Sequence, residues 1–343
     1  AACCNLAESF ETNPAIDVNL SDGLTGTKQI EMLGLTSSYL LITQENIPMV
    51  RGASQAYGLM FTPGTWIESI QITKGAGSVV NGYESISGQI NTELVKPLTD
   101  NAVFVNGYVN QNGRYELNTH FNRKLTEKLS TGLYVHGNTR TQKEDDNNDG
   151  FLDAPLGKQI NVMNRWQYQD AEKGWVSFFN VRFLNDEKQV GQVDFNPDTD
   201  KFTTNAWGSE IDTRRFDTSL KLGYVFPELP FQSLGFQTSY SLHKQDSYFG
   251  FRTYDINHES LYSNLIFNSI IGDTRNKFKT GITFAYDGYD ELVSATDYSR
   301  VDNSVGAFME YSYENLEKVS LTTGLRVDNH NRLGTFVTPS ISH

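Results

Sequence analysis

The sequence predicts a transmembrane antiparallel β-barrel that follows a small mixed domain. From Asn101 onward, apolar and polar side chains alternate residue by residue in about twelve segments, as expected for strands whose two faces meet different surroundings. These segments are commonly about ten to fifteen residues long, which exceeds the usual five or six residues of globular strands and suffices to cross a membrane at a tilt. The links between them alternate between short and long, which is typical of bacterial outer-membrane barrels.

The segment ahead of these strands has a different character. It is rich in Gly, Ile and small polar residues, and it ends near Pro97, where a proline would interrupt a strand ladder. We therefore predict two units, a mixed α+β domain at residues 1–99 and barrel strands at residues 100–343.

The alternation assigns one set of side chains to each face of every strand. In residues 129–136 apolar Leu and Val lie on one face, while Ser, Gly, Tyr and His lie on the other, and residues 278–287 and 319–328 repeat this division. The face turned toward the barrel interior carries four residues that could guide an anionic substrate: Arg182, His243, Lys279 and Arg326. Because barrel interiors are polar in any case, charged side chains there more often serve packing inside the barrel than a substrate.

The links support a barrel over a soluble β-sandwich. Short links are predicted at residues 122–127, 170–174, 227–231, 272–276 and 314–318. Longer links are predicted at residues 141–158, 185–208, 249–258 and 288–303. A sandwich or jelly roll would explain the alternation, but it would explain neither the strand length nor the regular difference between the two ends.

Composition and charge exclude several other classes. The formal charge of −13 makes nucleic acid an improbable partner, because a phosphate-binding surface needs an excess of Lys and Arg. The chain has no run near the roughly 20 apolar residues of a spanning helix. Adjacent Cys3 and Cys4 exclude a disulfide scaffold and a Cys-x-x-Cys pair, and leave either two thiols or a vicinal disulfide. The start lacks Met and an apolar leader, so we expect a trimmed or partial product.

The end of the first unit carries an ordered motif. Ile67–Gly75 reads IESIQITKG, and Gly88–Asn91 reads GQIN after a turn of small residues. This segment resembles the end of the plug domain in TonB-dependent outer-membrane receptors. Earlier segments, Thr27–Leu35 and Tyr39–Pro48, resemble preceding plug strands, and the opening Cys3–Phe10 resembles a Bacteroidetes-like branch of that family.

This resemblance implies a plug seated inside a barrel of about 22 strands, of which about twelve are present here. We therefore expect residues 1–99 to be an N-terminally incomplete plug and residues 100–343 a C-terminally incomplete barrel. It further implies a transporter, not an enzyme, in the outer membrane of a Gram-negative bacterium, in contact with outer-membrane lipid. Active uptake would be energised by the inner-membrane TonB complex, and the cargo would be a scarce nutrient. A metal chelate such as a ferric siderophore is the first candidate, with haem, cobalamin or a glycan as other family options.

Two alternatives remain at this stage. A receptor-like barrel could serve as a structural subunit of a larger outer-membrane assembly, with surface lipoproteins or other outer-membrane proteins as partners. An extracellular β-rich adhesin or carbohydrate-active enzyme would leave the plug-like segment unexplained.

The sharpest local motif predicts a structural Ca²⁺ site in the first long, extracellular loop. Oxygen ligands at alternating positions with glycine at the sixth place are typical of EF-hand-type loops, and Gly150 has that place if Asp145 is the first. The predicted ligands are Asp145, Asn147, Asp149, the Phe151 carbonyl and Asp153. The twelfth position is Leu156 and not Glu, so Asp153 or a residue elsewhere would supply the bidentate carboxylate. The alternative is an acidic, solvated loop that binds nothing.

The remaining candidates carry weaker signals. Four tryptophans could anchor the barrel at the membrane interface or pack in a core: Trp66, Trp166, Trp175 and Trp207. Five histidines have no paired spacing that would define a transition-metal site: His120, His136, His258, His330 and His343. No Ser-His-Asp or Cys-His arrangement is supported, so no catalytic residue or catalytic cofactor is predicted.

Overall fold

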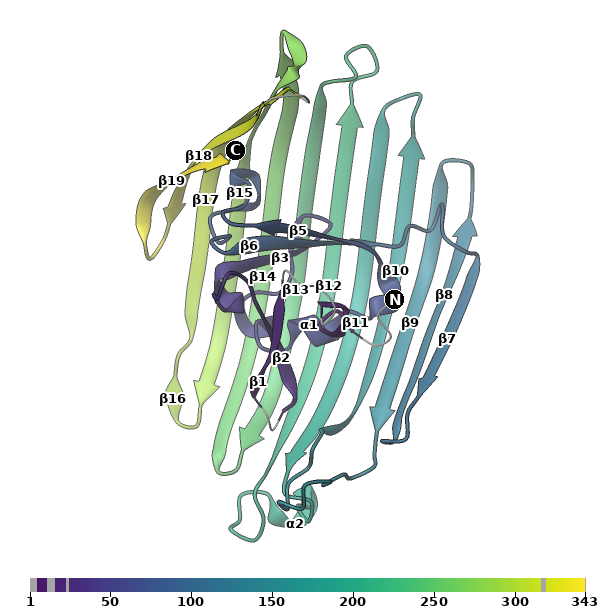
Figure 1. The fold of residues 1–343 in the computed structure, drawn as a ribbon, viewed down its shortest axis with the longest axis vertical. Helices are drawn as coiled ribbons and strands as arrows, with labels where there is room; N and C mark the ends of the chain where they lie inside the picture. The colour runs from purple at the N-terminus through teal and green to yellow at the C-terminus, as the bar shows by residue number, and fades with distance from the viewer. Residues whose placement is uncertain (1–4, 11–15, 23–24, 316–318, 343) are drawn as a thin grey trace.

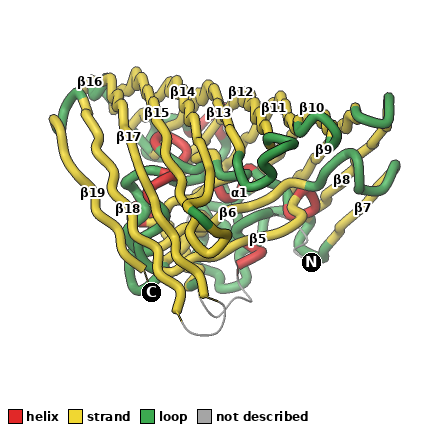
Figure 2. The backbone as a smooth tube through the Cα atoms, turned by 90° about the horizontal axis from the view of Figure 1, so that it is seen from above, coloured by secondary structure: helices red, strands yellow, loops and turns green. Residues whose placement is uncertain are grey.

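A computed structural model describes residues 5–10, 16–22, 25–315 and 319–342 of the chain. Cys3, Cys4, His343 and the last part of the predicted link at residues 314–318 lie outside the described residues. The chain forms a small N-terminal domain and a long sheet that curves around it (Figure 1, Figure 2).

The N-terminal domain contains two small sheets and a short helix. Their bounds are β1 Asp17–Asp22, β2 Thr27–Glu31, β3 Leu40–Gln44, β4 Ile47–Pro48, α1 Gly58–Phe61, β5 Ile67–Lys74 and β6 Gly88–Leu94. Strands β1 and β2 form an antiparallel pair, and the other four have the order β4-β3-β6-β5. Strand β3 is parallel to β6, and the other pairs in that sheet are antiparallel. The first four residues of β3, Leu40 to Thr43, are all buried, so both faces of this strand are covered. Its continuous apolar start, Leu40 to Ile42, fits that position.

Contacts in the structure explain the first and last residues of the GQIN motif in β6, Gly88 and Asn91. A Cβ added to Gly88 would lie 2.6 Å from the carbonyl oxygen of Thr73, so glycine permits close approach of β5. The Asn91 side chain accepts hydrogen bonds from the Thr43 hydroxyl at 2.9 Å and from the Asn46 backbone N–H at 2.8 Å. Asn91 therefore stabilises the tight turn between β3 and β4, where Asn46 has a φ of 64°.

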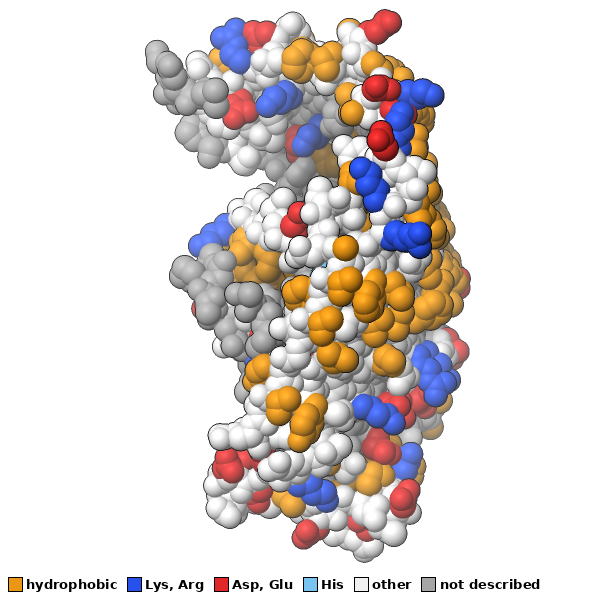
Figure 3. Space-filling model, turned by 90° about the vertical axis from the view of Figure 1, so that its right-hand side faces the viewer, with side chains coloured by type: hydrophobic (Ala, Val, Ile, Leu, Met, Phe, Trp, Pro, Cys, Tyr) orange, Lys and Arg blue, Asp and Glu red, His pale blue; other side chains and the backbone are white. Residues whose placement is uncertain are grey.

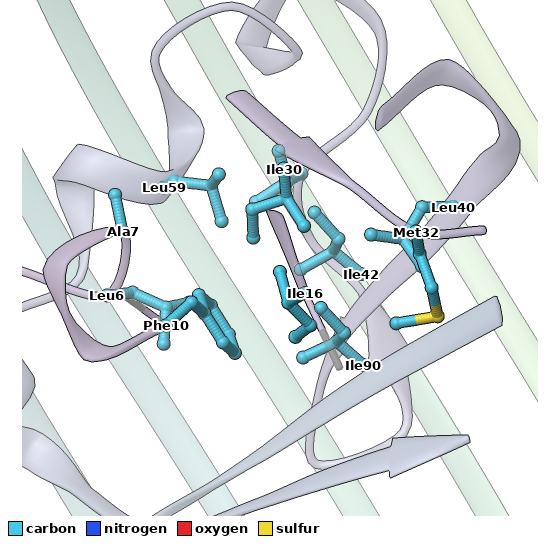
Figure 4. Packing of buried hydrophobic residues seen from close by; sticks show 11 residues of the cluster. Leu6, Ala7, Phe10, Ile16, Ile30, Met32, Leu40, Ile42, Leu59 and Ile90 are labelled. Atoms are coloured by element: carbon cyan, nitrogen blue, oxygen red, sulfur yellow. The ribbon is translucent and has the colours of Figure 1, made fainter. Parts of the chain in front are cut away.

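Around these strands, buried apolar side chains form the core of the N-terminal domain (Figure 4). The core includes Leu6, Ala7, Phe10, Ile16, Ile30, Met32, Leu40, Ile42, Val50, Leu59 and Ile90. It therefore joins the N-terminal turn, both small sheets and α1 into one body.

The long sheet takes up the rest of the chain. Its strands are β7 Val103–Val109, β8 Arg114–Lys124, β9 Leu129–Arg140, β10 Leu156–Asp170, β11 Trp175–Gly191, β12 Gly208–Val225, β13 Ser233–Phe249, β14 Arg252–Ile271, β15 Asp273–Val293, β16 Thr296–Asp297, β17 Arg300–Asn315, β18 Val319–His330 and β19 Gly334–Ser342. A short helix, α2 Pro197–Asp200, lies between β11 and β12. Within the described residues, twelve strands follow one another in antiparallel order from β7 to β19, and the short β16 pairs only with β15. The prediction of about twelve strands is confirmed.

The sheet is a curved wall with β7 and β19 at its two margins. Figure 2 shows the N-terminal domain on the concave side of this wall. The predicted division of side chains between the two faces is confirmed: Phe183 and Ile282 are 59% and 58% exposed on the convex side, whereas Arg182 is 3% exposed on the concave side. Figure 3, seen from the β7 side, shows hydrophobic side chains across the middle and charged ones toward both ends. This pattern fits an apolar membrane belt with polar margins.

Two of the four predicted long links are wrong. The links at residues 141–155 and 192–207 are long, but β13 and β14 are joined only by Gly250 and Phe251. The link between β15 and β17 is also short, because β15 continues to Val293. The strands continue through these segments, which contain several Gly, Asp, Asn, Ser and Thr residues that are typical of turns, so their sequence resembles a loop. At the first of these turns Gly250 has a φ of 60°, which favours glycine.

In the parts of the chain that the structure describes, no helix combines the length and the apolar character needed to cross a membrane.

Candidate functional site

The two ends of the long sheet differ. Both long links, at residues 141–155 and 192–207, leave the same end, which we call the long-loop end. At the opposite end the links at residues 125–128 and 171–174 are tight, and β14 and β15 are joined by Gly272 alone. In outer-membrane barrels the end with long loops faces the outside of the cell.

At the long-loop end, a cleft of about 400 Å³ lies between the N-terminal domain and strands β8 to β11. The N-terminal domain contributes Gly26 and Lys28 from the turn and start of β2, among others. The sheet contributes Arg114 and Arg140, which are directly opposite each other on β8 and β9. A ligand in this cleft would therefore contact both units of the protein at once.

Ion pairs hold most of the charged side chains of this cleft. Arg114 contacts Glu8 at 3.2 Å and Glu116 at 3.1 Å, so it joins the N-terminal domain to β8. Lys188 contacts Asp186 at 3.0 Å and lies 4.9 Å from the ring centre of Tyr57. Lys158 contacts Glu187 at 2.8 Å on the convex side. The cleft wall is therefore charged and largely fixed in place.

The predicted calcium loop forms part of this wall. Asp153 lines the cleft, and Pro155 packs against Gly26 of the N-terminal domain, where an added Cβ would lie 3.2 Å from the proline ring. Gly26 also has a φ of 60°. The β1–β2 turn and the loop between β9 and β10 are thus in direct contact.

The structure brings the predicted calcium ligands together in one tight turn. The Asp149 N–H donates to Asp145 Oδ1 at 3.0 Å and to Asn147 Oδ1 at 2.9 Å, and the Phe151 N–H donates to Asp149 Oδ1 at 2.8 Å. Asp153 accepts from the Asp146 N–H at 2.6 Å. Among the described residues, no group of three or more His, Cys, Asp and Glu side chains could hold a metal ion. The predicted set also contains an asparagine and a backbone carbonyl, so the calcium site stays a prediction.

This loop is tied to the second long loop, which the sequence did not indicate. The Leu152 N–H donates to the Gly191 carbonyl, and the Val193 N–H donates to the Gly150 carbonyl, both at 2.9 Å. The ring centres of Phe151 and Trp207 lie 6.4 Å apart. The two long loops therefore form one connected rim above the cleft.

Deeper in the barrel, the predicted inward-facing arginines contact the N-terminal domain. Arg182 donates to the Phe61 carbonyl, and Arg326 donates to the Val79 carbonyl at 3.1 Å. Lys279 lies on the same concave face but is exposed, 3.6 Å from Glu310. His243 is 1% exposed and lies beside Phe61. These contacts fit packing against the N-terminal domain better than an open guiding path.

Two ion pairs between the domain and the sheet had no sequence signal. Fully buried Arg165 on β10 contacts Glu45 of the β3–β4 turn at 2.5 Å. Arg51 contacts Asp287 on β15 at 2.7 Å, and the same carboxylate contacts His258 at 2.9 Å. Burial disfavours the charged form of Arg51, but nearby carboxylates, including that of Asp287, outweigh burial and raise its pKa above the ordinary value. The domain is therefore held by buried, charge-assisted contacts.

The remaining predicted residues divide by location. Trp166 and Trp175 are exposed on the convex face, as an interface anchor requires, whereas Trp66 is 1% exposed and packs against Tyr134 in the interior. Trp66 therefore follows the alternative of packing in a core. His243 and His258 are opposite each other on β13 and β14, a pairing hidden in the sequence by their separation.

Comparisons with known proteins agree with this architecture. Residues 4–89 match the family described as the TonB-dependent Receptor Plug Domain. The siderophore receptor PirA from Pseudomonas aeruginosa is similar in structure, with a TM-score of 0.68 at 17% identity over 98% of this chain and 57% of that chain. The alcaligin outer-membrane receptor FauA from Bordetella pertussis has a TM-score of 0.72 at 15% identity over 98% of this chain and 55% of that chain. The copper transporter OprC has a TM-score of 0.73 at 14% identity over 99% and 56%.

The chain thus spans between 55% and 57% of the length of these three structures. The matched family model, the similar fold and the position of the N-terminal domain inside the curved sheet all indicate a plug followed by barrel strands. Residues 4–89 therefore match the TonB-dependent receptor plug domain, and the sheet that follows has the fold of part of the barrel in outer-membrane receptors of known structure.

Proposed function

We propose that the protein takes up a scarce nutrient across the outer membrane, with a metal chelate such as a ferric siderophore as the cargo. The observation that carries this proposal is the cleft of about 400 Å³ at the long-loop end, which is lined jointly by the plug and the barrel sheet. A cargo bound there is positioned to report its presence to the plug. The siderophore receptor PirA shares the fold, which supports this class of cargo.

The plug must be displaced or remodelled before a cargo can pass, and its buried contacts oppose that step. Removing one partner from a buried ion pair costs about 3–5 kcal/mol, and the fully buried Arg165–Glu45 pair connects the plug to the sheet. The partly exposed Arg51 adds a second contact, with buried Asp287. Spontaneous displacement is therefore rare, and an external source of energy is required. We propose the inner-membrane TonB complex as this source and as the protein's partner, with residues 1–99 as the plug and residues 100–343 as part of the barrel.

The decisive experiment is uptake of an ⁵⁵Fe-labelled chelate in an iron-limited strain that lacks the gene. Uptake that returns with the gene, and that disappears when the TonB protein is deleted, is the expected result. Chelate binding without uptake, together with stable copurification of other outer-membrane proteins or surface lipoproteins, would instead support a structural subunit of a larger assembly.

We also propose that Ca²⁺ binds the loop at Asp145, Asn147, Asp149, Phe151 and Asp153 and stiffens it. The order of oxygen-bearing residues with glycine at the sixth place supports this proposal, and in the turn Asp145 and Asp149 accept hydrogen bonds from backbone N–H groups. The assignment to a Bacteroidetes-like branch rests on Cys3–Phe10 and stays a prediction.

A further inference from the structure

We propose that Arg140 is the anchor for an anionic oxygen group of the cargo, so that the protein selects anionic chelates over neutral ones. This inference rests on the proposed uptake of a metal chelate and names the charge class of that chelate. Arg140 ends β9 at the long-loop end, is half-buried, and lines the cleft between plug and sheet.

The first step is the charge inventory of the cleft. Its carboxylates already have partners: Glu8 contacts Arg114, Asp186 contacts Lys188, and Glu187 contacts Lys158. Asp153 accepts a hydrogen bond from the Asp146 N–H. Among the described residues, the Arg140 side chain has no hydrogen bond, ion pair or ring contact. A cation is therefore left without a counter-ion in the cleft of a chain whose formal charge is −13.

The second step is the placement of Arg140 beside another arginine. Arg140 and Arg114 are directly opposite each other on neighbouring strands, an arrangement that is destabilising for like charges. An anion bound between them would relieve that repulsion. Because the guanidinium offers a planar fork of N–H donors, it matches carboxylate and catecholate oxygens better than an uncharged group.

The third step is the position of the cleft relative to the plug. Arg114 already reaches Glu8 of the plug, and Lys28 of β2 lines the same cleft. An anion held by Arg140 therefore lies at the boundary between the sheet and the plug. Binding at this place changes the electrostatic environment of the Arg114–Glu8 contact, which connects the two units.

The test compares two ferric chelates in binding to the full-length protein in detergent micelles: an anionic ferric tris-catecholate and a ferric tris-hydroxamate that is neutral at the iron centre. In Arg140→Gln, affinity for the tris-catecholate is expected to fall about 10- to 100-fold, while affinity for the tris-hydroxamate is unchanged. Arg140→Lys keeps the charge and is expected to recover part of the loss. Arg123→Gln, which removes an exposed cation near the opposite end of β8, is the matched control.

The outcomes separate this inference from the function on which it rests. If the wild type binds the tris-catecholate and Arg140→Gln binds it equally well, or if Arg140→Gln weakens both chelates equally, the anchor assignment is overturned and chelate uptake stands. A wild type that binds only the tris-hydroxamate would also overturn the anchor assignment and leave chelate uptake in place. If the wild type binds neither chelate, the proposed cargo and the anchor fall together.

A second measurement does not depend on folding of the variant. Affinity of the wild type for the tris-catecholate is expected to fall as salt rises from about 0.05 to 0.5 M, because screening weakens a partly exposed charge contact. Affinity for the neutral chelate is expected to stay constant. Equal salt dependence of the two chelates would overturn the anchor assignment.

Discussion

At the scale of single residues, the plug is held in the sheet by a few buried side chains whose partners lie far away in the sequence. Glu45 is 3% exposed and contacts a fully buried arginine, whereas Glu68 forms an exposed pair with Lys96 on the plug surface. Replacing one partner of a buried ion pair therefore costs more stability than replacing one partner of an exposed pair. The remaining charge has no access to water in the buried pair, whereas water solvates it in the exposed pair.

The first prediction concerns this difference. Glu45→Gln leaves Arg165 buried without its counter-ion, and we expect the free energy of local opening of β3 and β6 to fall by about 3–5 kcal/mol. Hydrogen exchange of the β3 and β6 amides measures it. Glu68→Gln is the control and should change the same amides by about 1 kcal/mol or less. Equal effects of the two substitutions would show that the buried pair contributes little.

A second prediction at this scale concerns Gly88. Gly88→Ala places a Cβ 2.6 Å from the Thr73 carbonyl, so the two strands must separate, and we expect a loss of about 1–3 kcal/mol of plug stability. Gly107→Ala, in β7, meets no atom within 4 Å and is the matched control. Thermal unfolding of the two variants in detergent compares them. A Gly88→Ala protein as stable as the control would show that β5 can shift at no cost.

At the scale of elements, the rim at the long-loop end is built by two loops that pair with each other through backbone hydrogen bonds. The loop between β9 and β10 contacts both the second loop and the plug, through Phe151 and Pro155 respectively. Its conformation therefore affects the cleft, although few of its residues line that cleft. A ligand that stiffens this loop would stiffen the whole rim.

The third prediction tests the calcium site in this loop. Equilibrium dialysis of the intact protein with ⁴⁵Ca²⁺ is expected to find one site that Asp149→Ala removes, because Asp149 supplies one of the predicted carboxylate ligands. Chelation of calcium should then increase proteolytic cleavage within residues 141–155. Asp198→Ala, in the exposed helix α2 of the neighbouring loop, is the control and should leave the site intact. Calcium binding that survives Asp149→Ala would place the ion elsewhere.

At the scale of the whole molecule, the proposed transport would require the plug to move relative to the sheet. A Cβ added to Gly324 of β18 would lie 3.4 Å from the Cβ of Val79 in the plug, close to the Cβ spacing of a disulfide. These two positions therefore offer a covalent tie between the two units.

The fourth prediction uses this tie. In a background with Cys3 and Cys4 replaced by Ser, Val79→Cys with Gly324→Cys should bind the chelate when oxidised and import it only after reduction. Each single cysteine variant under the same oxidant is the control. Import by the oxidised double variant at the wild-type rate would show that this part of the plug need not separate from β18.

Much of this architecture could be predicted from the sequence because it rests on local patterns. Alternation in residues 278–287 defined a strand and its faces, and the order of Ile67–Pro97 indicated a plug. The sequence predicts a loop at residues 249–258 because Gly250, Asp255 and Asn257 are turn-forming residues, whereas the structure forms only a tight turn there, at Gly250 and Phe251. The cleft and the contact between Arg51 and Asp287 had no local signal, since only folding brings such distant residues together.

The short turn between β13 and β14 has a consequence for how the protein meets its surroundings. At this hairpin the backbone remains paired up to Phe249 and Arg252. An approaching protease, antibody or virus would therefore meet the hydrogen-bonded end of a hairpin and little unpaired backbone. Only the two long loops offer extended backbone at that end among the described residues. Pressure from such attackers would therefore act on these two loops, and the first of them borders the cleft between plug and sheet through Asp153 and Pro155. Changes that escape recognition there would also change the wall of that cleft.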